Sequence, residues 1–159
     1  RFSKSSLAMV CDYHFFRGFT TLEEVGRGAF GTVHRVRRDA DSKICVVKSV
    51  NLKQFETEKD RQQALSEVQI LKRLSCPCVV KYYDASVVQG RLHIILEHCE
   101  DGDLRSFLER VPEVLPENRL WRIFLSIALG LDYLHERRIL HRDVKSANIF
   151  LTARGGVRV

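Results

Sequence analysis

The most informative stretch of the sequence is residues 140–150, which read Leu-His-Arg-Asp-Val-Lys-Ser-Ala-Asn-Ile-Phe. Apolar residues border this stretch on both sides, and polar side chains alternate with anchoring residues between them. The pattern predicts a rigid loop that aims its polar groups in one direction. Asp143, Lys145 and Asn148 are therefore the first candidates for a reactive site.

These three residue types suit the transfer of a phosphoryl group. Asp143 can accept the proton of a hydroxyl, and Lys145 can neutralise the charge of the transferring group. Asn148 can offer its amide oxygen to Mg²⁺, a cation that prefers oxygen ligands. Phosphoryl transfer depends on positioning and charge neutralisation more than on covalent chemistry. A salt-bridged surface loop is the alternative, but the spacing matches a catalytic-loop signature.

A glycine-rich segment, residues 26–33, reads Gly-Arg-Gly-Ala-Phe-Gly-Thr-Val. A dinucleotide-binding fold would need a helix after it, and a strand-like alternation follows instead. A Walker A loop would need a lysine where the chain has Thr32. Two interpretations remain, an ordinary glycine-rich hairpin turn and a hairpin whose backbone approaches nucleotide phosphates. In the second, Val33 packs on a flat base.

Lys48 follows two valines on the next predicted strand. A buried lysine needs anionic partners, because an unpaired charge is expensive to remove from water. A phosphate beneath the glycine segment is one candidate partner, and Glu67 on the following predicted helix is another. Taken alone, Glu67 would be interpreted as a solvated helix residue, since charged side chains are mostly exposed.

Periodicity and breaker residues predict the remaining elements. Strands are predicted within residues 19–50, 79–88 and 92–97, and helices over 57–74, 103–110 and 117–136. Thr57 and Asp60 are predicted to cap the first helix. The last helix carries apolar residues on many sides, which is typical of a buried helix. Little chain follows it, so we expect much of its apolar surface to lack partners in this chain. One of its stripes contains Leu120, Phe124, Ile127, Leu131 and Leu134, and the other contains Trp121, Leu125 and Ala128.

Composition excludes several classes of protein. The chain has 159 residues, of which 45% are hydrophobic and 29% charged, so it is not intrinsically disordered. Its net charge is +6, but the basic residues are scattered, and we expect no nucleic-acid partner. No apolar run reaches the roughly 18 residues of a membrane span, so we expect no membrane association. Five cysteines without a signal peptide predict free thiols and a cytoplasmic location.

In order, the chain has the glycine segment, the strand lysine, the helix glutamate, a linker and the catalytic loop. It thereby resembles the eukaryotic protein kinase family over residues 19–159. The resemblance implies an α+β, two-lobed fold. After a lead-in segment at 1–18, a complete β-rich small lobe would occupy 19–98, and the hinge with the N-terminal part of the helical large lobe 99–159. Residues 141–145 resemble the serine/threonine type, and residues 97–104 and 141–151 are most similar to the NIMA-related branch.

The resemblance implies ATP and Mg²⁺ as cofactors and a protein with Ser or Thr as substrate. It makes Asp143 the catalytic base, Lys145 a contact of the γ-phosphate, Asn148 the Mg²⁺ ligand, and Lys48 a phosphate contact paired with Glu67. Leu96 would guard the back of the adenine pocket. The residues implied to bind the nucleotide are Val25, Gly26, Gly28, Gly31, Val33, Val46, Lys48, Leu96, Glu97, Cys99, Asp103, Asn148 and Phe150. Association with the cytoskeleton is a further expectation from the NIMA-related branch.

The family's Asp-Phe-Gly motif is expected directly after Val159. The resemblance therefore predicts that these residues form a catalytic-domain fragment, which by itself does not transfer phosphate. The alternative is a non-catalytic, kinase-like ATP-binding or scaffold protein, which a degraded motif at that point would favour. Two smaller departures are Val46, where the family usually has alanine, and residues 76–78, which read Cys-Pro-Cys where His-Pro-Asn is frequent.

Overall fold

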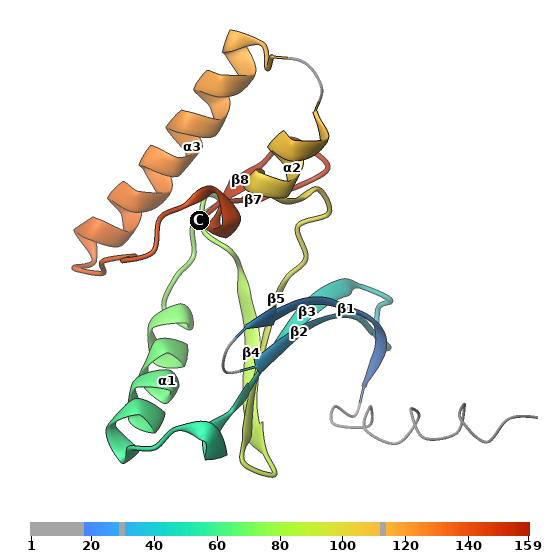
Figure 1. Ribbon diagram of the computed structural model, residues 1–159, viewed down its shortest axis with the longest axis vertical. Helices are drawn as coiled ribbons and strands as arrows, with labels where there is room; N and C mark the ends of the chain where they lie inside the picture. Colours follow the sequence, from blue (N-terminus) through green and yellow to red (C-terminus); the bar gives the residue numbers. More distant parts are fainter. Residues whose placement is uncertain (1–17, 29–30, 112–113) are drawn as a thin grey trace, which may run out of the picture. The chain divides into compact units, whose positions relative to one another are not determined.

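The structure is a computed structural model that describes residues 18–28, 31–111 and 114–159. It divides into two compact units (Figure 1). The first unit comprises the described residues up to Ser66 together with Asp84–Ile95, and the second comprises Glu67–Tyr83 and Leu96–Val159. Residues 1–17 of the predicted lead-in segment lie outside the described residues, and the predicted lobe boundary after residue 98 stays a prediction.

A five-stranded sheet dominates the first unit, with the strand order β1-β2-β3-β5-β4. Its strands are β1 (Phe19–Gly28), β2 (Gly31–Arg38), β3 (Ile44–Asn51), β4 (Tyr82–Val88) and β5 (Arg91–Glu97). Strands β1, β2 and β3 pair antiparallel along the chain, as the short turns between them predict. The buried apolar side chains of this unit are Val36, Cys45, Val47, Val50, Leu92, Ile94 and Ile95.

A short 3₁₀ helix, η1 (Leu52–Gln54), and the helix α1 (Glu58–Leu71) follow β3. The predicted capping of α1 is confirmed. The hydroxyl of Thr57 accepts a hydrogen bond from the backbone N–H of Asp60 at 3.1 Å and donates one to its carboxylate at 2.7 Å. Val68 is the buried residue of this helix. The helix ends three residues earlier than predicted.

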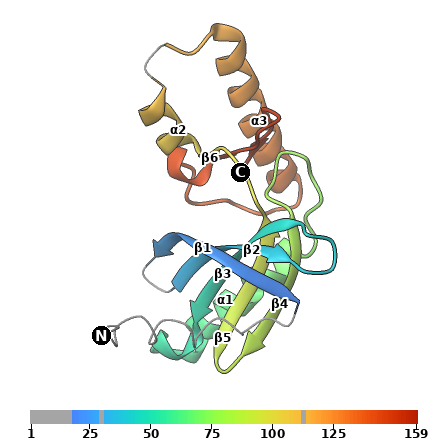
Figure 2. The same cartoon turned by 90° about the vertical axis from the view of Figure 1, so that its right-hand side faces the viewer.

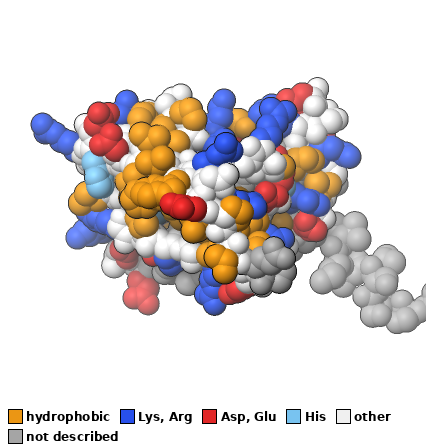
Figure 3. All heavy atoms as spheres, turned by 90° about the horizontal axis from the view of Figure 1, so that it is seen from above, with side chains coloured by type: hydrophobic (Ala, Val, Ile, Leu, Met, Phe, Trp, Pro, Cys, Tyr) orange, Lys and Arg blue, Asp and Glu red, His pale blue; other side chains and the backbone are white. Residues whose placement is uncertain are grey.

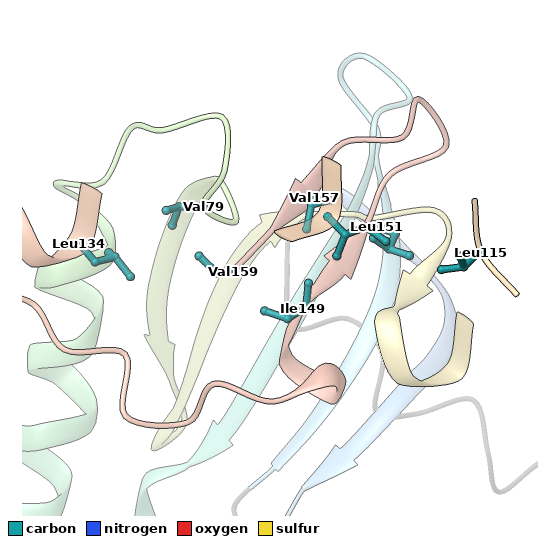
Figure 4. Close-up of a cluster of buried hydrophobic side chains, with 8 residues drawn as sticks. Val79, Leu115, Leu134, Ile149, Leu151, Val157 and Val159 are labelled. Atoms are coloured by element: carbon teal, nitrogen blue, oxygen red, sulfur yellow. The ribbon is translucent and has the colours of Figure 1, made fainter. Parts of the chain in front are cut away.

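The second unit contains a three-stranded sheet of β6 (Gly102–Asp103), β7 (Phe150–Leu151) and β8 (Val157–Arg158). Its helices are α2 (Leu104–Arg110), α3 (Glu117–Glu136) and the 3₁₀ turn η2 (Ser146–Asn148). The chain segments of this unit share one hydrophobic core (Figure 4). The buried core residues are Val79, Leu115, Ile123, Leu134, Ile149, Leu151, Val157 and Val159.

Much of the apolar surface of helix α3 is exposed, as predicted. Its buried residues are Ile123, Gly130 and Leu134, which face the core. Gly130 is required there, because a Cβ atom would lie 2.8 Å from the carbonyl oxygen of Cys78. The exposed apolar residues of the helix are Leu120, Trp121, Phe124, Leu125 and Leu129. Figure 3 shows hydrophobic side chains gathered at the surface seen from above.

Within the described residues, no helix combines the length and the apolar character that a membrane span needs.

A buried histidine makes the stability of the first unit depend on pH. His93 is 3% exposed, and its Nδ1 lies 2.8 Å from the hydroxyl of Ser49. Burial lowers the pKa of His93 below its usual 6.5, and the charge of Arg91 lowers it further. The unfolded chain therefore binds this proton more readily than the folded chain. The contribution of His93 to stability is complete above about pH 6.5 and is lost as the pH falls toward the lower, folded-state pKa.

This effect predicts that His93→Gln reduces the loss of stability between pH 7.5 and pH 5. The measurement is amide hydrogen exchange in β3 of both proteins across this range, which reports the opening free energy of the sheet. Comparing the two proteins removes the contribution of the carboxylates that titrate in both. Identical pH slopes for the variant and the parent would contradict the assignment.

Candidate active site

The predicted nucleotide-binding residues of the first unit lie on neighbouring strands. Gly26 of β1 is opposite Val33 of β2, and Val33 is in turn opposite Lys48 of β3. These three residues therefore form one row across the sheet. Gly28 and Gly31 face each other at the end of the β1–β2 hairpin, whose tip at residues 29–30 lies outside the described residues.

The glycines of this hairpin differ in how much space the surrounding chain leaves for a side chain. A Cβ atom on Gly31 would lie 1.8 Å from the carbonyl oxygen of Ser49, so the close approach of β2 and β3 requires glycine. A Cβ on Gly26 or Gly28 would make only ordinary contacts, at 3.7 Å and 4.0 Å. The chain itself has room for alanine at these two positions. Glycine there leaves space over β1 and β2, which fits the close approach of a phosphate group.

This difference predicts opposite outcomes for two alanine substitutions. Gly31→Ala is expected to disrupt the β2–β3 pairing and to lower the thermal midpoint, because backbone must move to admit the Cβ. Gly28→Ala is expected to leave the midpoint within about 2 °C, an effect of a few tenths of a kcal/mol, and to weaken the binding of a fluorescent ATP analogue. Circular dichroism melts and a binding titration of both variants test this. Equal melting losses would contradict it.

The catalytic loop is fixed at its end by the core of the second unit. Ile149 is 2% exposed, and its carbonyl oxygen accepts a hydrogen bond from the N–H of Leu104 at 2.7 Å. Within the loop, the N–H of Asn148 bonds the carbonyl of Lys145 at 2.8 Å. Arg142 adopts a left-handed conformation with φ of 64°, which costs roughly 1–2 kcal/mol for a residue other than glycine. Packing therefore holds this loop in a conformation that its own backbone disfavours.

The loop brings together the three residues on which the phosphoryl-transfer prediction rests. The ammonium of Lys145 lies 2.9 Å from Oδ2 of Asp143. The side-chain amide of Asn148 donates to the same Oδ2 at 2.7 Å and to the backbone carbonyl of Asp143 at 2.9 Å. The hydrogen bond from Lys145, and after it that from Asn148, lower the pKa of Asp143. The carboxylate is therefore ionised at neutral pH and held in one orientation.

The same hydrogen bonds bear on a metal ion. Because the amide nitrogen of Asn148 is directed at Asp143, its amide oxygen lies on the other side of the side chain and is available as a hard ligand. Carboxylate and amide oxygens are suitable donors for Mg²⁺. Among the described residues, however, no group of three or more His, Cys, Asp or Glu side chains could hold a metal. The loop thus fits Mg²⁺ as a partial ligand set.

The other predicted residues of the second unit lie in β5, β6 and β7, except Cys99, which lies between β5 and β6, and Glu67, which lies in α1. Asp103 of β6 pairs with Phe150 of β7. Both carboxylate oxygens of Asp103 accept hydrogen bonds from Ser106, from its N–H at 2.9 Å and from its hydroxyl at 2.7 Å, which caps α2. Burial opposes the ionisation of Asp103, but these hydrogen bonds outweigh it and its pKa is lowered. Its predicted contact with ribose or substrate stays a prediction.

The predicted hinge residues are held by polar contacts. The N–H of Glu97 donates to the carbonyl of Lys81 at 2.9 Å. The carboxylate of Glu97 accepts a hydrogen bond from the N–H of Lys81 at 2.8 Å. Burial, and then the charge of Glu97, raise the pKa of Cys99 to about 12. Cys99 is therefore a neutral thiol, and the four described cysteines are free of disulfides. Leu96 lies directly before Glu97 near the end of β5, and Val25 and Val46 lie in β1 and β3, respectively.

Sequence reasoning missed Arg158. Its guanidinium forms a 2.8 Å ion pair with Glu97 in the second unit, and both side chains are largely buried. The pair links the predicted hinge to β8, 61 residues away in the chain. The only sequence signal was a charged residue between two valines at the end of the chain, and nothing in it identified the partner.

Comparison with known proteins identifies the family of this chain. A family model described as "Protein kinase domain" matches residues 19–159. Human serine/threonine-protein kinase Nek5 is 35% identical over 140 residues, which cover 87% of this chain and 20% of that protein. Mouse Nek4 is 39% identical over 137 residues, covering 85% and 17%, and human Nek11 is 36% identical over 141 residues, covering 85% and 22%. The chain thus spans about a fifth of the length of these relatives. It belongs to the protein kinase family, and these relatives are serine/threonine kinases of the NIMA-related type.

Proposed function

We propose that the protein containing this chain is a serine/threonine protein kinase that transfers the γ-phosphoryl group of ATP to a protein hydroxyl. The observation that carries the proposal is the fixed arrangement of Asp143, Lys145 and Asn148 on one packed loop. Bound ATP with Mg²⁺ would supply the phosphoryl group and part of the charge neutralisation that such a reaction needs.

In this proposal Asp143 orients the substrate hydroxyl and accepts its proton. Its lowered pKa makes it a weak base, so its main contribution is to hold the hydroxyl in line for attack. Lys145 already lies beside this carboxylate and places a positive charge where negative charge develops. Asn148 keeps the carboxylate in orientation through its amide nitrogen and would offer its oxygen to Mg²⁺.

The residues proposed to hold the nucleotide are those that match the motifs of the family. Lys48 is proposed to contact phosphates, with Glu67 as its anionic partner, and the glycines at 26, 28 and 31 to cover them. The proposed adenine and ribose contacts are Val25, Val33, Val46, Leu96, Glu97, Cys99, Asp103 and Phe150. Free thiols at the described cysteines support a cytoplasmic location for the protein.

The proposal is tested most directly by comparing which amino acid accepts the phosphoryl group. The protein containing this chain, supplied with ATP and Mg²⁺, is offered three otherwise identical peptides with Ser, Thr or Tyr as the sole hydroxyl amino acid. Transfer to the Ser and Thr peptides and not to the Tyr peptide is expected. ATP binding without transfer to any acceptor would favour a non-catalytic, kinase-like protein. Residues 1–159 alone are expected to show no turnover above a Lys48→Met control.

A further inference from the structure

The five-stranded sheet carries a hollow of about 890 Å³ that lies entirely within the first unit. Val47 and Ser49 of β3 line it, whereas Lys48 does not. Because side chains alternate between the two faces of a strand, the hollow lies on the face opposite to Lys48. It is therefore separate from the proposed nucleotide site. A volume of this size falls within the range of ligand-binding sites in proteins, about 300–1,000 Å³.

Two irregularities in β1 shape the hollow. Thr21, Glu24 and Arg27 all line it, although they are spaced by three residues rather than two. The pairing of β1 with β2 shifts between Thr21 and Glu23 and again between Glu24 and Gly26. Each extra residue returns the next side chain to the same face and bends the strand. Figure 2 shows β1, β2 and β3 side by side in this sheet.

One end of the hollow is positively charged. Lys53 and Arg91 line it, and the side chain of Lys53 lies over Gly90. A Cβ atom on Gly90 would come within 2.7 Å of the Cε of Lys53. Glu24 is the one carboxylate residue among the described residues that line the hollow, and Arg27 binds both of its oxygens, at 2.9 Å and 2.8 Å. Lys53 and Arg91 therefore leave an excess of positive charge.

The other end of the hollow is apolar. Phe19 and Val36 line it there, and the register places Phe19 opposite Arg38, at the far end of β2 from Thr32. From Thr32 to Val36 the strand advances about 13 Å, at roughly 3.3 Å per residue. An extended segment of four or five residues would span this distance. Because one end of the hollow is positively charged and the other is apolar, a segment that fits it must carry negative charge at one end and an apolar side chain at the other.

We propose that this hollow is a docking surface for a short, extended acidic peptide segment of a partner protein. Carboxylates of the segment would meet Lys53 and Arg91, and an apolar side chain at its other end would meet Phe19 and Val36. Charge complementarity of this kind favours the encounter of the partners and fixes the orientation of the bound segment. The proposal does not depend on kinase activity, because its site and its test involve binding alone.

The test uses the 159-residue chain and a fluorescein-labelled tetrapeptide of three glutamates and a leucine, made with the leucine at either end. Fluorescence anisotropy is expected to show binding that weakens as salt rises from 20 to 300 mM, a range we choose to span the onset of screening. Lys53→Glu/Arg91→Glu is expected to weaken binding about tenfold or more, since each partly exposed ion pair is worth up to ~1 kcal/mol and reversal adds repulsion. The milder Lys53→Gln/Arg91→Gln pair is expected to weaken it about threefold to tenfold.

The matched control is Arg37→Glu/Lys59→Glu, which changes the overall charge equally at two exposed residues outside the hollow. It is expected to bind within twofold of the parent. Perturbation of the His34 ring signals in NMR spectra, with no change at His135 or His141, would locate the peptide in the hollow. Absence of binding to the parent, an equal loss in the control pair, or undiminished binding by a folded Gln variant would overturn the proposal.

Discussion

Replacing Asp143 by Asn is expected to reduce phosphoryl transfer by the protein containing this chain by a factor of about 10²–10⁴, the usual contribution of a positioned acid–base group. The substitution preserves shape but removes the negative charge that Lys145 neutralises at 2.9 Å, and it replaces one of the two carboxylate oxygens by an NH₂ group that cannot accept a proton from the substrate hydroxyl. Steady-state rates of peptide phosphorylation measure it. The loss should appear in kcat, because Asp143 acts on the acceptor hydroxyl rather than on the nucleotide.

The control for this prediction is Asp132→Asn, an exposed acid on α3 that takes no part in the catalytic loop. Its kcat should stay within about twofold of the parent value, since exposed substitutions away from a site have small effects. ATP affinity, measured separately, should be similar in all three proteins. A kcat for Asp143→Asn within tenfold of the parent, with the fold intact, would remove Asp143 from the proposed role.

The sequence could predict that Asp143, Lys145 and Asn148 lie together because the interactions among them are local. Asp143, Lys145 and Asn148 lie within six residues, and the two apolar edges of the loop indicate how it is held. The capping of α2 by Asp103 can be predicted from the sequence in the same way, since the capping residue and its partner Ser106 are three positions apart. Short-range chemistry of this kind can be read from one chain without knowledge of its packing.

Packing over long sequence separations could not be read in the same way. The apolar stripes of α3 did not indicate which of its faces meets the core; one face is buried, and Phe124 on another is 60% exposed. The buried face includes Gly130, whose lack of a side chain gives no hydrophobic signal and is explained by the nearby Val159 side chain and Cys78 carbonyl. The ion pair of Glu97 with Arg158 escaped notice for the same reason, because its partners are 61 residues apart.

The second large effect is expected from Ile149→Ala. Ile149 directly follows the proposed Mg²⁺ ligand Asn148 and is 2% exposed in the core of the second unit. Removing a buried side chain of this size usually costs 2–5 kcal/mol, so we expect a loss of about 3 kcal/mol. That is a large share of the 5–15 kcal/mol that stabilises a typical domain. Urea unfolding followed by the fluorescence anisotropy of Trp121, the one tryptophan in the chain, reports on this unit.

The matched control is Val144→Ala in the same loop, where the side chain is 51% exposed. Its unfolding free energy should change by no more than about 0.5 kcal/mol, because little apolar surface is lost. If the two variants unfolded at the same urea concentration, the core would not be what anchors the loop. If Ile149→Ala alone unfolds early, the left-handed Arg142 and the hydrogen bonds around Asp143 depend on a hydrophobic contact outside the reactive group itself. The geometry of the proposed catalytic residues is then a consequence of how the second unit packs.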